Sequence, residues 1–190
     1  NKEVGSSAAL SMAHTRKDTI KTRKIAVLAA GGFDDAGLAD LTQALTQAGG
    51  QVKIVAPRLG TIQGAHGTEV TVDCSFLTSA SVLFDAVYIP DGDESVTALL
   101  NEADAIHFVR EAYKHCKAIA ATGAGVELLR AAHLDVDNMV GTETVGQEVA
   151  AAEGVVIGQE AQAGKVAAAF ITAIAQHRHW SREMKHPVPA

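Results

Sequence analysis

Three mostly apolar runs, each ending at a turn, constrain the fold of this chain more than any other feature of its sequence. They span residues 25–30, 85–90 and 117–121, and a fourth strand-like run at 51–56 ends before a proline. Apolar runs of this length are typical of parallel strands buried on both faces of a sheet. Segments with helical spacing lie between them, so the alternation predicts an α/β fold with a doubly wound, mostly parallel sheet.

The apolar spacing between these strands predicts four helical regions. Leucines recur at helical spacing after the first strand, and two glycines follow them. A glycine-containing turn precedes the helix that follows the strand at 117–121. We expect helices over 35–48, over 94–116 in two pieces around Asn101, from 126 to about 132, and over 162–179.

Other segments predict shorter elements and the limits of the folded unit. Apolar and polar residues alternate over 60–75, with Cys74 included, which predicts an antiparallel hairpin. The segments 140–142 and 155–157 predict short edge strands. We expect one domain over 24–182, a linker or arm over 1–23 and a C-terminal tail over 183–190.

Length and charge exclude several classes of protein. A chain of 190 residues fits one domain, and its formal net charge of −6 argues against a general nucleic-acid binder. The two cysteines cannot form a dense disulfide framework, and no apolar run approaches the roughly 20 residues of a membrane span. The first residues contain neither an initiator methionine nor a signal peptide, so we expect a trimmed chain or a piece of a longer one.

Ligands of doubly wound sheets bind beyond the carboxyl ends of the strands. Three loops are expected to meet there: 31–35, 91–94 and 122–125. The first lacks the G-x-G-x-x-G pattern of a dinucleotide site, and its Asp34 and Asp35 are expected to cap a helix rather than to act as acid or base. The third has the strand–turn–helix position of an elbow nucleophile, but Gly123 carries no side chain there.

The remaining chemically interesting residues form no convincing motif. Cys74 and Cys116 lie away from the elbow and are expected to be structural thiols. His177 and His179 would point to different faces of the expected last helix, which does not suit a metal site. Trp180 follows basic residues at that helix end, and both docking on a partner and covering this domain's own core are open for it.

The residues around the elbow resemble the PfpI-type protease and class I glutamine amidotransferase-like superfamily, whose fold is flavodoxin-like. The strand at 117–122 corresponds to the family strand that ends in a nucleophilic cysteine. Gly123 falls on the cysteine position, Ala124 on the histidine that follows it, and Asp34 on the family's acidic partner. The resemblance therefore implies a vestigial pocket at Asp34, Thr122, Gly123 and Ala124.

The chain is also similar to the C-terminal domain of large-subunit (clade 2) haem catalases, in which this fold has lost the cysteine. Four segments carry the resemblance: a linker at 8–12 and 20–26, a helix at 111–117, a terminal helix at 175–182 and a tail at 185–190. It implies a cytoplasmic, tetrameric parent enzyme that decomposes hydrogen peroxide at a haem. The haem and its ligands would belong to the preceding part, with Tyr88 and Tyr113 as ordinary strand and helix residues.

The leading hypothesis is a non-catalytic accessory domain that stabilises the parent, helps it to assemble or fold, and shapes the approach to the haem. It assigns no catalytic, cofactor or metal residue to this chain; the catalase core and the other subunits would be its partners. Two alternatives stay open. One is a stand-alone PfpI-type enzyme that uses Asp34, and the other is a module that binds a metabolite near Asp34 and Gly123.

Overall fold

The sheet at the centre of the molecule is built on the predicted apolar runs. A computed structural model describes residues 7, 9, 11, 17–136, 149–159 and 163–185, except the side chains of 163, 184 and 185. The predicted runs form the inner strands β1 (Lys24–Leu28), β2 (Gln51–Ala56), β6 (Ala86–Ile89) and β7 (Ala118–Thr122). These strands are joined by β5 (Cys74–Ser75), β8 (Val149–Ala152) and β9 (Val155–Gly158) in the order β5-β2-β1-β6-β7-β9-β8.

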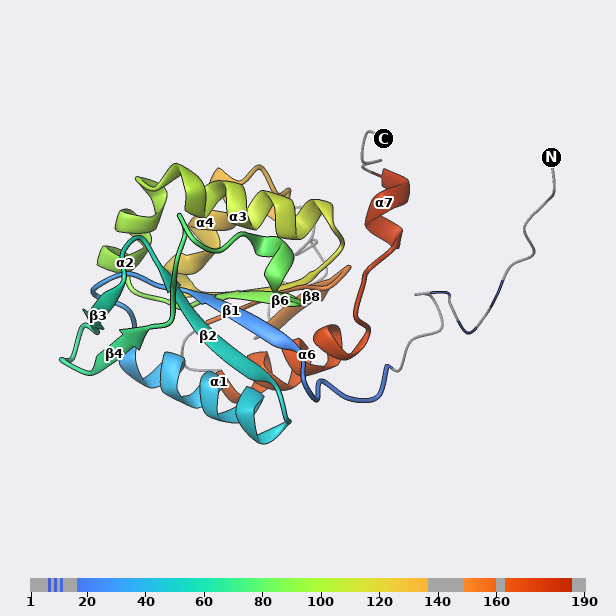
Figure 1. The fold of residues 1–190 in the computed structure, drawn as a ribbon, viewed down its shortest axis with the longest axis horizontal. Coiled ribbons are helices and arrows are strands. Elements are labelled where there is room, and N and C mark those ends of the chain that lie inside the picture. The colour runs from blue at the N-terminus through green and yellow to red at the C-terminus, as the bar shows by residue number, and fades with distance from the viewer. Residues whose placement is uncertain are drawn as a thin grey trace.

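All neighbouring strands of this sheet are parallel except β8 and β9, which are antiparallel. Helices α1 (Asp35–Gln47) and α6 (Ala163–Ala175) cover one face, and α2 (Asp93–Leu100), α3 (Ala103–Lys114) and α4 (Val126–Ala131) cover the other (Figure 1). Short 3₁₀ turns, η2 (Ser81–Leu83) and η3 (Gly123–Gly125), precede β6 and α4. The predicted doubly wound α/β fold is therefore confirmed.

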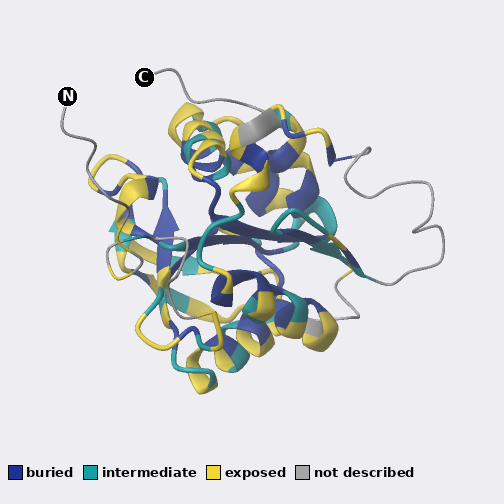
Figure 2. Cartoon of the chain, turned by 90° about the vertical axis from the view of Figure 1, so that its right-hand side faces the viewer, coloured by how far each residue is buried: buried dark blue, intermediate teal, exposed yellow. Residues whose placement is uncertain are grey.

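Side chains of the central strands divide between two buried layers. In β1, Ile25 and Val27 join the layer under α1 and α6, whereas Ala26 and Leu28 join the layer on the opposite face. Because successive residues of a strand point to opposite faces, a run that is apolar throughout can serve both layers. Figure 2 shows the resulting buried sheet between helices whose outer surfaces are exposed.

The predicted hairpin exists, but Cys74 does not belong to it. Strands β3 (Gly60–Gln63) and β4 (Glu69–Val72) pair with each other outside the main sheet. Asp73 then redirects the chain: its N–H donates to the Ile54 carbonyl at 3.0 Å, and its carboxylate accepts from the Ile54 N–H at 2.8 Å. Cys74 and Ser75 consequently pair in parallel with β2.

The second half of the sheet differs from the prediction. The strand predicted at 155–157 is present as β9, but it lies between β7 and β8 and is not an edge strand. The edge position belongs to β8, an alanine-rich segment without a strong strand pattern. The segment 140–142, also predicted as a strand, lies outside the described residues.

The last helix is shorter than predicted. The pieces predicted on either side of Asn101 are confirmed as α2 and α3, but α6 ends at Ala175 and not near residue 179. His177 has a φ of 68°, and the His179 N–H donates to the Cys116 carbonyl at 2.8 Å. The left-handed conformation at His177 ends the helix, and a further short helix, α7 (Ser181–Lys185), follows.

Packing starts slightly before β1. Ile20 is 1% exposed in the layer under α1, and the Thr22 N–H donates to the Gly49 carbonyl at 2.9 Å. The described part of the predicted arm therefore contacts the body of the domain. None of the helices in the described residues is long and apolar enough to cross a membrane.

Candidate functional site

The elbow predicted after the strand at 117–121 is present. Strand β7 ends at Thr122, the tight turn η3 follows, and α4 begins at Val126. Gly123 at the tip of the turn has a φ of +49°, a conformation that costs a residue with a Cβ about 1–2 kcal/mol. The backbone therefore has the shape that presents an elbow nucleophile, although the residue there has no side chain.

The carboxylate of Asp91 occupies the space that a side chain at Gly123 would need. A Cβ built on Gly123 would lie 1.7 Å from Oδ2 and 2.0 Å from Cγ of Asp91. The N–H groups of Ala124 and Gly92 both donate to Oδ1 of Asp91, at 2.8 and 2.7 Å. In an elbow enzyme, the N–H after the nucleophile stabilises the oxyanion. Here that N–H, from Ala124, is bound to a carboxylate of the protein itself.

The contacts of the Thr122 side chain hold neighbouring strands together. Its side chain is buried, its Oγ1 accepts a hydrogen bond from the Asp91 N–H at 3.1 Å, and it lies 3.0 Å from the Tyr88 hydroxyl. These contacts connect the ends of β6 and β7. They give the Thr122 hydroxyl no base that could activate it as a nucleophile.

Asp34 caps α1, as predicted. Its carboxylate oxygens accept from the N–H groups of Ala36 at 3.2 Å and Gly37 at 2.7 Å, and the residue is only 8% exposed. The Asp34 N–H donates to the Asp91 carbonyl at 2.8 Å. The first and second loops are thus joined directly, and Asp91 joins both of them to the elbow, so the three predicted loops meet.

A surface cleft of about 590 Å³ lies where these loops meet. Of the four residues of the predicted pocket, Asp34 and Ala124 line it, whereas Thr122 and Gly123 are not among its lining residues. His66 from the hairpin and three further acidic residues complete its polar wall: Asp91, Asp93 and Glu127. Within the described part of the chain, no group of three or more His, Cys, Asp or Glu residues is placed to hold a metal ion.

Asp35 holds the hairpin against this cleft. Its carboxylate accepts from the backbone N–H groups of His66 and Thr68, both at 2.8 Å. Hydrogen bonds from Thr68 and His66 lower the pKa of Asp35 from 3.8 to about 2. Asp35 was expected to cap a helix, as an alternative to acting as acid or base, but only Asp34 caps α1. The sequence does not show which loop will lie beside Asp35.

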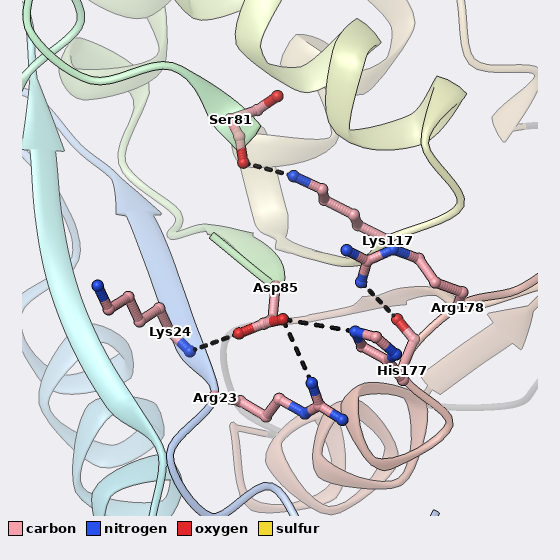
Figure 3. A network of polar contacts seen from close by, with 7 residues as sticks. All are labelled: Arg23, Lys24, Ser81, Asp85, Lys117, His177 and Arg178. Atoms are coloured by element: carbon pink, nitrogen blue, oxygen red, sulfur yellow. Dashed lines mark hydrogen bonds and ion pairs between the residues drawn. The ribbon is translucent and has the colours of Figure 1, made fainter. Parts of the chain in front are cut away.

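A second polar cluster lies at the opposite, amino edge of the sheet (Figure 3). Asp85, just before β6, lies 3.5 Å from the Arg23 guanidinium and 3.7 Å from Nε2 of His177, and it accepts from the Lys24 N–H at 2.9 Å. Burial, with a smaller contribution from the charge of Arg178, lowers the pKa of His177 from 6.5 to about 4. The start and the end of the domain are therefore joined through one carboxylate.

Two buried cations extend this cluster. Lys117 is 3% exposed and donates to the Ser81 carbonyl, and burial lowers its pKa from 10.5 to about 8. Arg182 is 2% exposed and donates to the carbonyls of Glu153 at 2.7 Å and Lys117 at 2.9 Å, above the Tyr113 ring. Burial lowers its pKa to about 10, so the guanidinium stays charged at neutral pH. Nothing in the sequence indicates that Arg182 is buried.

The other candidate residues occupy separate places. Cys116 is buried, and its burial raises the pKa of its thiol; Cys74 is partly buried at the sheet edge. His177 and His179 lie beyond the end of α6, and Nε2 of His179 is 3.1 Å from the Ala173 carbonyl. Trp180 is 41% exposed and lines a small cavity with Val82, so its side chain does not fill the core.

Most of the chain is similar to one part of known catalases. Residues 21–184 match the family described as the C-terminal domain found in long catalases. Catalase HPII of Mycobacterium avium is 44% identical over 181 residues, which cover 93% of this chain and 25% of the relative. Catalase-2 of Bacillus subtilis is 40% identical over 184 residues, which cover 97% of this chain and 24% of the relative. The chain thus spans about a quarter of the length of these relatives.

Solved structures show a similar fold at low sequence identity. A ThiJ/PfpI domain protein from Brachyspira murdochii superposes with a TM-score of 0.70 at 21% identity, covering 81% of this chain and 97% of that protein. DJ-1 from Schizosaccharomyces pombe superposes with a TM-score of 0.66 at 16% identity, covering 87% and 100% of the two chains. The predicted PfpI-type, flavodoxin-like architecture is therefore confirmed.

Proposed function

The chain belongs to the family of C-terminal domains found in long catalases, and from this premise we propose that it is the non-catalytic accessory domain of a large-subunit haem catalase. The parent would decompose hydrogen peroxide to water and oxygen. This domain would stabilise the parent tetramer and help it to assemble or fold. It would also shape the approach to the haem without supplying a reacting group.

The observation that carries this proposal is that the Asp91 carboxylate occupies the side-chain position of the elbow at Gly123, an arrangement that we call the filled elbow. Catalysis of acyl transfer at such a turn needs a nucleophile and a free oxyanion donor. Here Gly123 supplies no nucleophile, and the Ala124 N–H donates to Asp91 at 2.8 Å. The carboxylate of Asp34 is equally committed, because both of its oxygens cap α1. These contacts favour a scaffold whose former site has become part of its structure.

Neither tyrosine of the chain is placed to bind a haem iron. An axial ligand needs a side chain that is free to reach the iron from the wall of a large cavity. Tyr88 is fully buried, and its hydroxyl lies 3.0 Å from Thr122. The Tyr113 ring lies under Arg182, with its centroid 4.6 Å from the guanidinium carbon. In this proposal the haem and its ligands lie in the part of the parent that precedes residue 21.

Removal of residues 21–190 from the parent enzyme tests the proposal. We expect the truncated enzyme to keep its turnover of peroxide per bound haem within about twofold, because no reacting group is removed. We expect its melting temperature to fall and its tetramer to dissociate at lower urea concentration, because a docked domain stabilises the assembly. Loss of turnover per haem at unchanged haem content would contradict the non-catalytic role.

A matched variant separates this role from that of a stand-alone enzyme. Asp34→Ser keeps a side-chain oxygen for the cap of α1 but removes the carboxylate. We expect this chain to leave peptide and glyoxal substrates unchanged, with or without the substitution. The PfpI-type enzyme would be established instead if the chain turned over a substrate saturably and Asp34→Ser abolished this turnover. The variant would have to melt at the same temperature as the unsubstituted chain.

A further inference from the structure

A small cavity at the amino edge of the sheet combines basic and aromatic side chains. It measures about 230 Å³ and is lined by residues of η2, of the end of α3 and the link from it to β7, and of α7 and the segment before it. Three cationic residues and one carboxylate residue line it: Lys114, Lys117, Arg178 and Glu183. Val82, 78% exposed, and Trp180, 41% exposed, also line it. We call these six residues the Trp180 face.

Two cations of the Trp180 face bind neutral groups within the described part of the chain. Lys117 donates to the Ser81 carbonyl, and Arg178 donates to the His177 carbonyl at 2.9 Å. Asp85 attracts both cations and Glu111 also attracts Lys117. The close contacts of Asp85 go to Arg23 and His177, and Glu111 lies 3.5 Å from Nε2 of His115. Burial lowers the pKa of Arg178, as it does that of Lys117. A carboxylate from outside would compensate this excess of positive charge.

The apolar residues of the face also favour the binding of a partner. Trp and Arg side chains are enriched among the residues that dominate binding energy at protein interfaces. Here an exposed Trp180 lines the same cavity as Arg178 and the exposed Val82. This combination is suited to a protein segment that offers an acidic side chain beside an apolar one.

The course of the chain indicates which segment can reach the face. Arg23, just before β1, shares Asp85 with His177, next to Arg178 (Figure 3). Whatever precedes residue 21 is therefore joined to the domain at this same edge. The relatives are about four times as long as this chain, so most of each relative lies outside the matched region. A tethered partner binds at a high effective concentration.

We propose that the Trp180 face is the docking surface for an acidic segment of the polypeptide that precedes residue 21. An Asp or Glu of that segment would be bound by the half-buried Arg178, above the buried Lys117, and an apolar neighbour would pack on Trp180 and Val82. This inference rests on the proposed function, since that segment would belong to the catalase core of the same or a neighbouring subunit.

Photo-cross-linking in the complete parent protein tests the proposal. A benzophenone amino acid in place of Trp180 is compared with the same probe in place of Leu59, which is 63% exposed and lies beyond the carboxyl end of β2. We expect the probe at 180 to capture an Asp- or Glu-containing peptide from before residue 21, and the probe at 59 not to capture it. Capture of only residues 21–190 of another copy, or of no peptide, would overturn the proposal.

Charge reversal supplies a second, independent readout. We expect Arg178→Glu to speed proteolytic release of the domain from the folded parent about tenfold, because removing one member of a buried charge pair mainly speeds dissociation. Arg110→Glu, the same change at an exposed position of α3 outside the face, should leave the rate unchanged. Equal rates for the two variants would count against the docking face.

The two proposals fail in distinguishable ways. If truncation leaves both melting temperature and assembly unchanged while the probe at 180 still captures the acidic peptide, the accessory role fails and the docking face stands. If truncation destabilises the parent but the probe at 180 captures nothing from before residue 21, the accessory role stands and docking takes place elsewhere.

Discussion

Replacement of Gly123 by alanine tests whether the Asp91 carboxylate fills the side-chain position of the elbow. The new Cβ would lie 1.7 Å from Oδ2 of Asp91, about half the roughly 3.5 Å of a normal contact. The φ of +49° adds about 1–2 kcal/mol for a residue with a Cβ. Displacing the carboxylate loses its hydrogen bond from Ala124, which is worth about 1.5–3 kcal/mol. We expect Gly123→Ala to lower the free energy of unfolding by about 2.5–5 kcal/mol.

A double-mutant cycle isolates the clash from the backbone strain. Asp91→Ala by itself loses the hydrogen bonds from Ala124 and from Gly92, and the bond from Ala124 alone should cost about 1.5–3 kcal/mol. In the double variant this hydrogen bond is lost only once, so its cost should fall below the sum of the single costs by about 1.5–3 kcal/mol. Urea unfolding followed by circular dichroism measures all four free energies.

Two other glycines provide matched controls. Gly164, in the first turn of α6, has open space where a Cβ would lie, and Gly164→Ala should stabilise the chain by up to about 1 kcal/mol. Gly60 also has open space but a φ of +125°, so Gly60→Ala measures the backbone cost without a clash. Additivity of Gly123→Ala and Asp91→Ala within about 0.5 kcal/mol would refute the filled elbow.

Three further predictions concern the buried charges and the hairpin. Arg182→Met should lower the free energy of unfolding by about 3 kcal/mol and the Tm by roughly 6–12 °C, because buried carbonyls lose their donor. A decrease in this free energy below about 1 kcal/mol, measured by calorimetry, would contradict this. His177→Asn should reduce the loss of stability, in urea titrations, as the pH falls from 6.5 to 4, because the folded state binds fewer protons there than the unfolded state. Asp35→Asn should speed the exchange of the His66 and Thr68 amide protons, measured by NMR above pH 4, because their acceptor is lost. In the unsubstituted chain these amides should be protected from exchange, and their protection should weaken only as the pH falls from about 4 toward 2, where the carboxylate becomes protonated. Unchanged exchange in the variant would exclude this anchoring role.

The central fold could be predicted because its signal is local. Residues 25–28 are apolar at every position, and the structure buries them in two layers, as a two-faced parallel strand requires. The cap at Asp34 was predictable for the same reason, since a cap and the N–H groups it binds lie within one turn. The meeting of the three loops followed from topology, because parallel strands end at the same edge of a sheet.

What sequence reasoning missed depends on contacts between distant segments. Asp91 was predicted only to lie in one of the three loops that meet, and its approach to Gly123, 32 positions away, shows that it fills the elbow. The burial of Arg182 needs carbonyls from two separate segments, those of Tyr113 and Lys117 and that of Glu153. The left-handed backbone at His177 lacks the glycine or asparagine that usually indicates a helix end, so α6 was predicted too long.

The mass of the native polypeptide tests most directly whether this chain is a domain of a haem catalase. An antibody against the chain would be used on native cell extract, with haem absorbance and peroxide decomposition followed in the same fractions. Because the chain spans about a quarter of its relatives, we expect a band several-fold heavier than 19.7 kDa that co-migrates with both signals. A band at 19.7 kDa with no heavier form would contradict this assignment, and would make the cleft beside Asp34 and Asp91 the place to search for function.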